Sequence, residues 1–342
     1  MQRRKGNMKL HRLLLAAATI CSLVICAIPG VAKEYKLTFA EAAGPEHIIT
    51  QFNERFAEYV EEETNGQIKV NVVPGGLFGS YESMLEQVQQ GSVDFCIIGS
   101  SISGDVVPQV MLMLLPYLYE TEEEVNYIVQ QRDIMERVEA EFYKKGVKVV
   151  TWSFASLRNT LTKSNPMKNV SDFEGLKIRA PGRPVLLAMK DLGANPIPMP
   201  FAEIFTAMQT GMVDAVERNT FVMKQEGWEK IVGYLNMDGH SGDALAIAMN
   251  TGLWEELTPE LQSAVAKAGE RAYQWAYEYN LEANKEIKTF YPENGIEIIT
   301  YSEEQQKQFY QATANARKIL TDEIGEELTN LVMEKLKAYR AQ

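Results

Sequence analysis

The sequence has 342 residues, of which 46 are acidic and 34 are lysine or arginine, and its formal net charge is −12. This length suits two lobes better than one compact core. The acidic balance argues against nucleic acid and anionic membrane surfaces as partners. An anionic ligand would therefore have to be attracted by a local basic pocket.

The first 32 residues have the order of a secretory signal. Five basic residues without an acidic one precede an apolar run from Leu13 to Ile28, and small residues lead up to Ala32. Because the run is short for a bilayer span, we expect cleavage near Ala32 and an exported chain, with an uncleaved anchor as the alternative. Removing the signal leaves 310 residues with a net charge of −17 and one cysteine, Cys96, whose apolar neighbours indicate a buried residue.

Strand-like and helix-like segments alternate in the first part of the remaining chain. Alternating or wholly apolar patterns predict strands over 35–42, 67–74, 93–99 and 147–152. Helical patterns lie over 46–64, 80–90 and 121–145. Ser80 is the expected N-cap of the second of these helices, and Thr121 with Glu124 predicts a capping box for the third.

A second set of strands and helices begins near Ser156. Strands are predicted over 176–179, 213–217 and 245–249, and helices over 185–192, 201–211, 258–291, from 302 onwards and over 322–339. The helix that Thr258 and Pro259 open is longer than is usual in globular proteins, which indicates an element that ties two lobes together. The sequence therefore predicts an α/β fold with two lobes, a ligand cleft between them and a long connecting helix.

The sequence contains none of the common motifs of catalytic chemistry. Outside the signal the histidines are His47 and His240, too far apart in sequence to spell out a metal site. The glycine-rich turn at 75–79 lacks both dinucleotide-binding spacing and a P-loop lysine, and the segment 99–103 departs from the nucleophile elbow. We expect no catalytic residues, no metal and no cofactor, although a glycosidase-like pair of carboxylates stays open as an alternative.

The most informative block lies between Ser156 and Asn219. It contains G-L-K-I-R at 175–179, followed from Pro196 by P-x-P-x-x-F-x-E-x-x-x-A-x-Q-x-G-x-V-D. In these motifs, and in the order of elements over the whole chain after the signal, the sequence resembles the solute receptors of tripartite ATP-independent periplasmic (TRAP) transporters, of the C4-dicarboxylate-receptor type.

The resemblance implies a periplasmic-binding-protein-like fold and a receptor function. Lobe I is expected over 33–155 with a return segment at about 243–285, and lobe II over 156–242 with C-terminal helices at about 286–342. Such a receptor captures a small carboxylate in the periplasm and delivers it to membrane permease subunits, as a monomer by default and without nucleic acid. A sensor receptor that presents the same ligand, and an exported hydrolase, are the alternatives.

Arg179 is the first candidate for ligand binding. It ends a predicted strand that Pro181 stops, so its guanidinium would lie at the carboxyl end of the strand and could hold a carboxylate through two parallel hydrogen bonds. The resemblance assigns it that role. Arg158 matches a second arginine of the family that faces the cleft, and Phe201 matches an aromatic position that packs against the ligand.

Further candidates are less sharply defined by the family pattern. Arg218 and Asn219 compete for the position of a family asparagine, because this chain has Glu-Arg-Asn where many members have Glu-Asn. In the first lobe, Ser100, Ser101 and His47 are candidates for hydroxyl recognition, and His47 could instead cap the following helix.

The resemblance also narrows the ligand. Receptors of the family that bind sialic acid have polar residues where this chain has Ala42 and Gly99. The expected ligand is therefore another sugar acid, such as a hexuronate, with a C4-dicarboxylate or other small carboxylate as the runner-up. Trp152 and His240 are expected to have structural roles, with stacking against a sugar as the alternative for Trp152.

Overall fold

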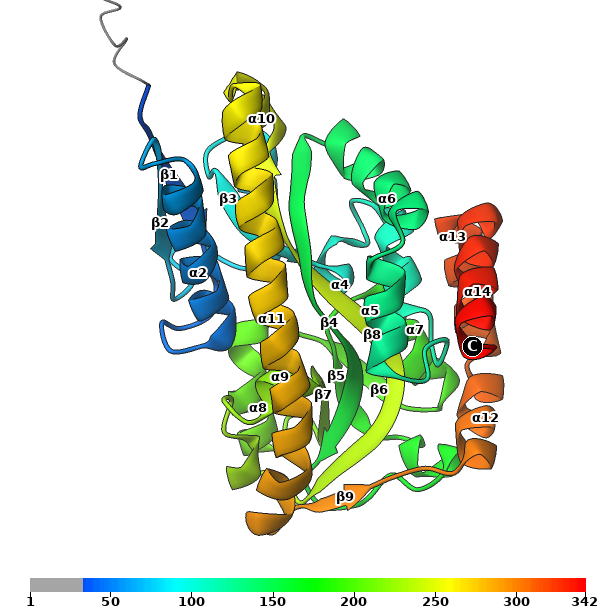
Figure 1. Ribbon diagram of the computed structural model, residues 1–342. Helices are drawn as coiled ribbons and strands as arrows, with labels where there is room; N and C mark the ends of the chain where they lie inside the picture. The colour runs from blue at the N-terminus through cyan, green and yellow to red at the C-terminus, as the bar shows by residue number, and fades with distance from the viewer. Residues whose placement is uncertain (1–32) are drawn as a thin grey trace, which may run out of the picture. The chain divides into compact units, whose positions relative to one another are not determined.

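A mixed β-sheet runs through residues 33–342, the part of the chain that the computed structural model describes (Figure 1). The predicted signal lies outside the described residues. Within them the sheet has nine strands in the order β2-β1-β3-β8-β4-β7-β5-β6, with β9 paired to β8. The strands are β1 (Tyr35–Ala40), β2 (Ile68–Val73), β3 (Phe95–Gly99), β4 (Val147–Thr162), β5 (Lys177–Ala180), β6 (Asn195–Pro198), β7 (Ala215–Asn219), β8 (Tyr234–Asn250) and β9 (Glu297–Ile299).

Helices surround the sheet, and among the described residues none has the length and hydropathy needed to cross a membrane. In the first half they are α2 (Ile48–Glu63), α3 (Tyr81–Gln90), α4 (Ser100–Ser103), η1 (Pro108–Leu114), α5 (Glu122–Val129) and α6 (Arg132–Lys144). In the second half they are η2 (Val170–Phe173), α7 (Arg183–Asp191), η3 (Phe201–Glu203), α8 (Ile204–Thr210), α9 (Thr220–Met223) and η4 (Trp228–Lys230). The last are α10 (Thr251–Glu256), α11 (Pro259–Glu293), α12 (Glu303–Ala312), α13 (Ala314–Ile324) and α14 (Glu326–Arg340).

The long antiparallel strands β4 and β8 join two lobes. The first lobe contains β1 to β3, and β3 pairs with residues 245–249 of β8; the second contains β5 to β7, and β7 pairs with residues 158–162 of β4. The register between β4 and β8 shifts around Phe154, whose φ is 46°. Phe154 stacks on Phe221 with 4.5 Å between the ring centroids. The passage between the lobes is therefore a bulged strand fixed by aromatic packing.

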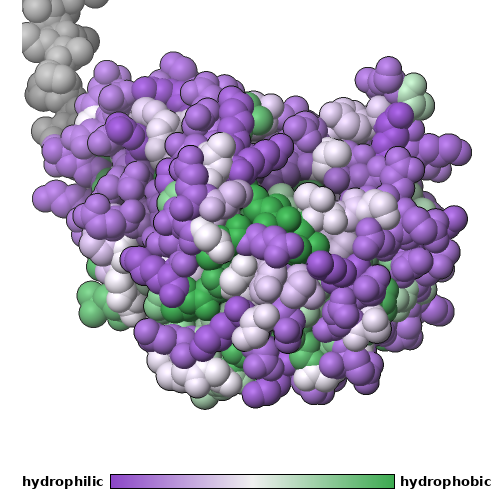
Figure 2. All heavy atoms as spheres, turned by 90° about the horizontal axis from the view of Figure 1, so that it is seen from below, coloured by the Kyte–Doolittle hydropathy of each residue, from purple (hydrophilic) through white to green (hydrophobic). Residues whose placement is uncertain are grey.

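Each lobe has a hydrophobic core of its own. In the first lobe the rings of Phe39 and Phe95 stack at a centroid distance of 5.8 Å, on the sheet that α2 covers. In the second lobe Trp228 and Tyr291 are buried in one cluster, and Phe173 lies in another. Outside these cores, hydrophilic residues predominate on the face that Figure 2 shows, and hydrophobic residues are visible there mainly in a central patch.

The predicted long helix is confirmed as α11. The Thr258 side chain accepts a hydrogen bond from the Leu261 amide at 3.4 Å, and Pro259 stands in the first turn. The helix packs against α2 in the first lobe and against α9 and β9 in the second (Figure 1). One element therefore contacts both lobes; the domain limits expected from the sequence remain a prediction.

Some sequence-based boundaries were wrong. The helix predicted over 121–145 is two helices, broken at Gln130 and Gln131. The carboxylate of Glu124 accepts from the Glu120 amide, so Thr121 caps α5 without a complete capping box. The strand predicted to end at 152 continues to residue 162, because it pairs with both β8 and β7 in the second lobe.

Candidate functional site

A cavity of about 340 Å³ lies between the two lobes. From the first lobe it is lined by residues that follow β1 and β3, such as Ala42 and Ser101. From the second lobe it is lined by residues near the ends of β5 and β7, such as Arg179 and Asn219. Because ligands of open α/β sheets bind beyond the carboxyl ends of the strands, this is the position expected of the predicted cleft.

Arg179 is fixed in the cavity wall by the second lobe. Its Nε and Nη2 donate to the carbonyl oxygen of Met199 at 3.2 and 3.1 Å, and Nη1 donates to Glu217 Oε1 at 3.1 Å. Burial, together with the charges of Arg218 and Arg158, lowers the pKa of Arg179 to about 10 although Glu217 opposes the change. The positive charge of Arg179 is therefore only partly compensated by the protein.

Arg158, in β4, is more completely engaged. Nε donates to the Glu217 carboxylate, Nη1 donates to Asn219 Oδ1 at 2.8 Å and to Asp243 Oδ2 at 2.5 Å, and Nη2 donates to the Glu217 carbonyl at 3.4 Å. Burial disfavours its charge, but the two carboxylates outweigh burial and raise the pKa of Arg158 above its ordinary value. Its charge is therefore balanced within the protein.

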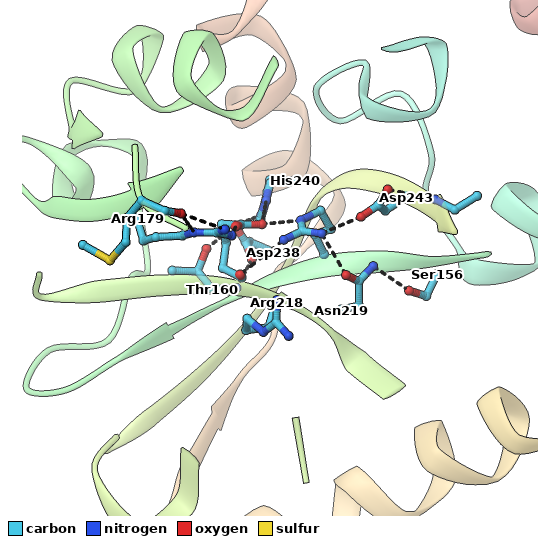
Figure 3. Close-up of polar contacts among 12 residues, drawn as sticks. Ser156, Thr160, Arg179, Arg218, Asn219, Asp238, His240 and Asp243 are labelled. Carbon is cyan, nitrogen blue, oxygen red and sulfur yellow. Dashed lines mark hydrogen bonds and ion pairs between the residues drawn. The ribbon is translucent and has the colours of Figure 1, made fainter. Parts of the chain in front are cut away.

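Glu217 connects the two arginines through its two carboxylate oxygens. Because side chains alternate along a strand, Glu217 and Asn219 share one face of β7, opposite Thr160 and Arg158 of β4. Burial disfavours the ionised form, but Arg158 and its neighbours outweigh burial and hold the pKa of Glu217 well below its usual range. Figure 3 shows the resulting row of contacts, from Arg179 at one end to Asp243 at the other.

Arg218 belongs to a different group, and Figure 3 shows it apart from this row. Its Nε donates to Glu226 Oε2 at 2.7 Å, its Nη2 donates to the other oxygen, and its Cζ lies 5.2 Å from the centre of the Phe201 ring. Burial disfavours the charge of Glu226, but Arg218 outweighs burial and lowers the pKa of Glu226 to about 2. His47 Nε2, from the first lobe, lies 3.4 Å from Glu226 Oε1. Glu226 thus links a cavity arginine to the opposite lobe.

The three arginines differ in the donors that remain for a ligand. A guanidinium has five N–H donors. In hydrogen bonds to described residues, Arg158 uses four of them, Arg179 three and Arg218 two. Arg179 and Arg218 can therefore still bind a carboxylate, whereas Arg158 mainly orients Asn219 and the acidic side chains.

The predicted site residues do not all reach the cavity. Those that line it are Arg179, Arg158, Phe201, Asn219 and Arg218. Ser100 is buried beside β8, where its Oγ donates to the Ala244 carbonyl at 3.2 Å, and Ser101 lines the cavity instead. His47 lies behind Phe201, with the ring centroids 5.9 Å apart.

The contacts of His47, Trp152 and Cys96 show the roles of three other residues for which the sequence raised an expectation. His47 Nδ1 accepts from the Ile49 amide at 3.2 Å, so it caps α2, and the remaining proton on Nε2 can be donated to Glu226. Trp152 packs near Phe142 and donates to Glu139 at 3.0 Å. Cys96 is buried in β3, as the sequence indicated.

His240 is buried next to the row of charged residues. Its Nδ1 lies 3.1 Å from Asp238 Oδ2, and its Nε2 lies 3.7 Å from Glu217 Oε2. Burial disfavours the imidazolium, but Asp238 and Glu217 outweigh burial and raise the pKa of His240 to about 9. The native protein therefore holds this proton up to a higher pH than the unfolded chain does.

This proton makes stability depend on pH. The stabilisation is complete below the ordinary histidine pKa of 6.5 and is lost as the pH rises through about 9. We expect the free energy of unfolding to fall over this interval by on the order of 3 kcal/mol. Urea unfolding curves measured from pH 6 to pH 10 would show the fall in the parent protein and not in His240→Gln, and equal pH profiles would contradict the assignment.

Two lobes meet closely at Gly182, just after β5. A Cβ atom at this position would lie 2.4 Å from the backbone oxygen of Ser101 in α4. The backbone is extended, with φ at −167°, so other residues could adopt the conformation but would collide with the opposite lobe. Gly182 therefore permits the approach of the two rims of the cavity.

Sequence reasoning missed the acidic partners of the arginines. Glu217 could have been found, because it stands two residues before Asn219 on the same strand face. Asp243 and Glu226 gave no local signal, since their positions depend on the path of the chain after β7. Within residues 33–342 no group of three or more His, Cys, Asp or Glu side chains is arranged as a metal site.

The chain matches a known family over most of its length. The family model for the bacterial extracellular solute-binding proteins, family 7 (DctP), matches residues 39–322. The 2,3-diketo-L-gulonate-binding periplasmic protein YiaO of Escherichia coli K12 is 28% identical over 247 residues, which are 72% of this chain and 75% of that relative. The family is one of transport receptors rather than of enzymes.

Solved structures share the fold. The sugar acid binding protein DctPAm from Advenella mimigardefordensis, in complex with galactonate, gives a TM-score of 0.84 at 21% identity and covers 90% of this chain and 99% of that one. A TRAP periplasmic solute-binding protein from Roseobacter denitrificans with bound β-D-glucuronate gives a TM-score of 0.82 at 21% identity. The match covers 87% of this chain and 99% of that one. The chain therefore belongs to family 7 of the bacterial extracellular solute-binding proteins, the receptors of TRAP transporters.

Proposed function

We propose that this protein binds a small organic acid in the cavity between its lobes and delivers it to the membrane permease of a TRAP transporter. The observation that carries the proposal is the presence of two arginines with unused donors, Arg179 and Arg218, in the wall of one cavity. A buried guanidinium with spare donors favours a carboxylate, which it binds by charge-assisted hydrogen bonds.

Arg179 is the proposed anchor of the carboxylate. Its neighbour Arg158 is neutralised by two carboxylates, whereas Arg179 shares Glu217 and otherwise donates to an uncharged carbonyl. An incoming carboxylate would complete the charge balance of Arg179. Arg158 would hold Glu217 in place, and both Arg158 and Asn219 could donate to the same ligand.

Phe201 and Arg218 are proposed to contact the rest of the ligand. Arg218 lies next to the Phe201 ring, so a second acidic group of a dicarboxylate could bind there. Relatives whose names or bound ligands are sugar acids support a small organic acid as the ligand, and the hexuronate expected from the sequence is one candidate within that class. Ser100 and His47 would act indirectly, through the backbone of β8 and through Glu226.

Capture would proceed by closure of the lobes around the acid. The cavity has walls from both lobes, and the bulge at Phe154 lies on the strand that joins them. Closure excludes water, which strengthens ion pairs inside the cavity. A membrane permease would then recognise the closed receptor.

A thermal-shift screen tests the proposal. The purified protein is heated with hexuronates, aldonates, C4-dicarboxylates and monocarboxylates, and a ligand that binds the native state raises the melting temperature by mass action. We expect at least one acid to stabilise the parent, and we expect Arg179→Ala to weaken its affinity about 100-fold or more because the carboxylate loses a buried ionic partner.

The matched control is Arg183→Ala, four residues further along the chain. The Arg183 side chain is 47% exposed and forms a surface pair with Glu323, so its removal should leave the affinity unchanged. Stabilisation by neutral sugars or amines alone, or full acid binding by Arg179→Ala, would contradict the arginine-centred site.

A further inference from the structure

Away from the arginines, the wall of the cavity is mainly apolar. Both lobes contribute aliphatic, aromatic or proline side chains to it. These residues are Ala42, Ile49, Ile97, Ile102, Pro181, Pro200, Phe201, Ala202, Phe221, Val222 and Leu245. The cationic groups are confined to Arg158, Arg179 and Arg218, all from the second-lobe side. Away from the arginines, a ligand in this cavity therefore meets mainly apolar side chains, and they come from both lobes.

The glycine turn of the first lobe offers few free donors. The Gly75 amide donates to the Ala43 carbonyl at 2.7 Å, the Gly76 amide to the Glu41 carbonyl at 3.0 Å and the Gly79 amide to the Gly76 carbonyl at 2.9 Å. These three backbone N–H groups are already used inside the protein. The turn shapes the wall rather than presenting amides to a ligand.

The tyrosine in this wall is also occupied. Tyr81 lines the cavity, but its hydroxyl donates to Glu41 Oε1 at 2.6 Å. Glu41 is fully buried and also accepts from the Asn53 side chain and the Ala43 amide, both at 2.7 Å. The phenol is thus held in a network behind the wall and is not directed at a ligand hydroxyl.

For polar recognition the first-lobe wall retains the hydroxyls of Ser80 and Ser101 and the carboxylate of Glu82. Ser80 lines the cavity, but its Oγ accepts from the Ser83 amide as the cap of α3 at 3.3 Å. Ser101 lines it as well, and Glu82 stands exposed at the rim. A sugar acid carries hydroxyls along its whole body, and each one that is buried without a partner costs roughly tenfold in affinity.

We infer that the cavity selects a carboxylate with an apolar body, of branched aliphatic or aromatic character, over a polyhydroxylated sugar acid. The inference rests on the proposed function, because it uses the arginines as the site of the carboxylate. The apolar wall gains affinity from each aliphatic or aromatic group that leaves water. A hexuronate would instead place its hydroxyls against isoleucine, valine, leucine and phenylalanine side chains.

Calorimetric titrations of the parent with isovalerate and phenylacetate, and with galacturonate and gluconate, test this inference. We expect the apolar acids to bind at least tenfold more tightly, with a negative heat-capacity change on binding. Tighter binding of the hydroxylated acids would overturn the inference and leave the proposed function standing. Binding of none of the acids tested here or in the thermal-shift screen would overturn both.

Two variants add a hydroxyl to the apolar wall. Val222→Thr keeps the side-chain volume nearly constant. We expect it to lower the affinity for the apolar acids about fivefold or more and to leave the affinity for the hydroxylated acids unchanged. Ala42→Ser makes a smaller change at a half-buried position and should shift the preference in the same direction. Val70→Thr, half-buried in β2 outside the cavity, is the matched control and should change no affinity by more than about twofold. If each variant bound each class of acid with the same affinity as the parent, the inference would be contradicted.

Discussion

Replacement of Glu217 by alanine is expected to lower the free energy of unfolding by about 3–5 kcal/mol, the usual cost of breaking a buried ion pair by removing one partner. Glu217 is fully buried and neutralises charge on both Arg158 and Arg179. Without Glu217, Arg179 has no carboxylate partner among the described residues. His240 also loses one of its two neighbouring carboxylates and keeps Asp238. Urea denaturation at pH 7 measures the change.

Two further variants identify the cause of the loss. Glu217→Gln keeps the size and one carbonyl acceptor but removes the charge, so it should also destabilise the protein, although less than alanine. Glu327→Ala removes a carboxylate whose side chain is 85% exposed and pairs with Arg137, and it should change stability by less than about 1 kcal/mol. If Glu217→Ala behaved like the Glu327 variant, the row of charges would not stabilise the fold.

Substitution of Gly182 by alanine is expected to weaken ligand affinity by about tenfold or more, and to change the stability of the ligand-free protein by at most about 1 kcal/mol. The added Cβ would lie 2.4 Å from the Ser101 backbone oxygen, and backbone atoms on opposite rims have no flexible end that could move aside. Overpacking of this kind costs about 1–3 kcal/mol. The cost applies to the closed lobes, because open lobes relieve the contact.

Titration with the acid that stabilises the parent best, together with melting temperatures without ligand, checks this expectation. Gly182 is also the N-cap of α7. Replacement of this cap by alanine by itself changes the free energy of unfolding of the ligand-free protein by up to about 1 kcal/mol. Gly44→Ala is the matched control, since nothing lies within 4 Å of its added Cβ and its backbone is not left-handed. An unchanged affinity in Gly182→Ala would show that closure does not need this contact.

The sequence predicted the position of Arg179 because the relevant signals are local. The strand at 176–179, the proline that ends it and the spacing of the motif all lie within a few residues. Its surroundings were not predictable in the same way. Asp243 reaches Arg158 only because β8 pairs with β4 in one register, and that pairing joins residues far apart in the chain.

The choice between Arg218 and Asn219 shows the limit of a linear motif. The sequence offered them as alternatives for one position, whereas in the structure both line the cavity. Asn219 shares the strand face of Glu217 and binds Arg158, while Arg218 points to the group formed by Glu226 and Phe201. Side chains alternate along β7, so neighbouring residues point to opposite faces of the strand. The sequence predicts a strand that ends at 217, and this alternation therefore could not be applied to Arg218 and Asn219.

The length of β4 was underestimated for a related reason. Ser153, Ser156 and Arg158 interrupt the apolar pattern after residue 152, so the pattern indicated a strand that ends there. In the folded protein these polar side chains are buried and form hydrogen bonds with residues of β7 and β8. A buried polar strand has no signature in hydropathy alone.

The pairing of β3 with β8 has a consequence for the order in which the chain can fold. The apolar strand Phe95–Gly99 has β1 on one side, and its other edge stays open until residues 245–249 are available. During synthesis the ribosome must therefore add about 150 further residues before the first lobe can complete its sheet, and contacts of such long range form slowly. The N-terminal half therefore cannot complete its sheet ahead of the rest of the chain.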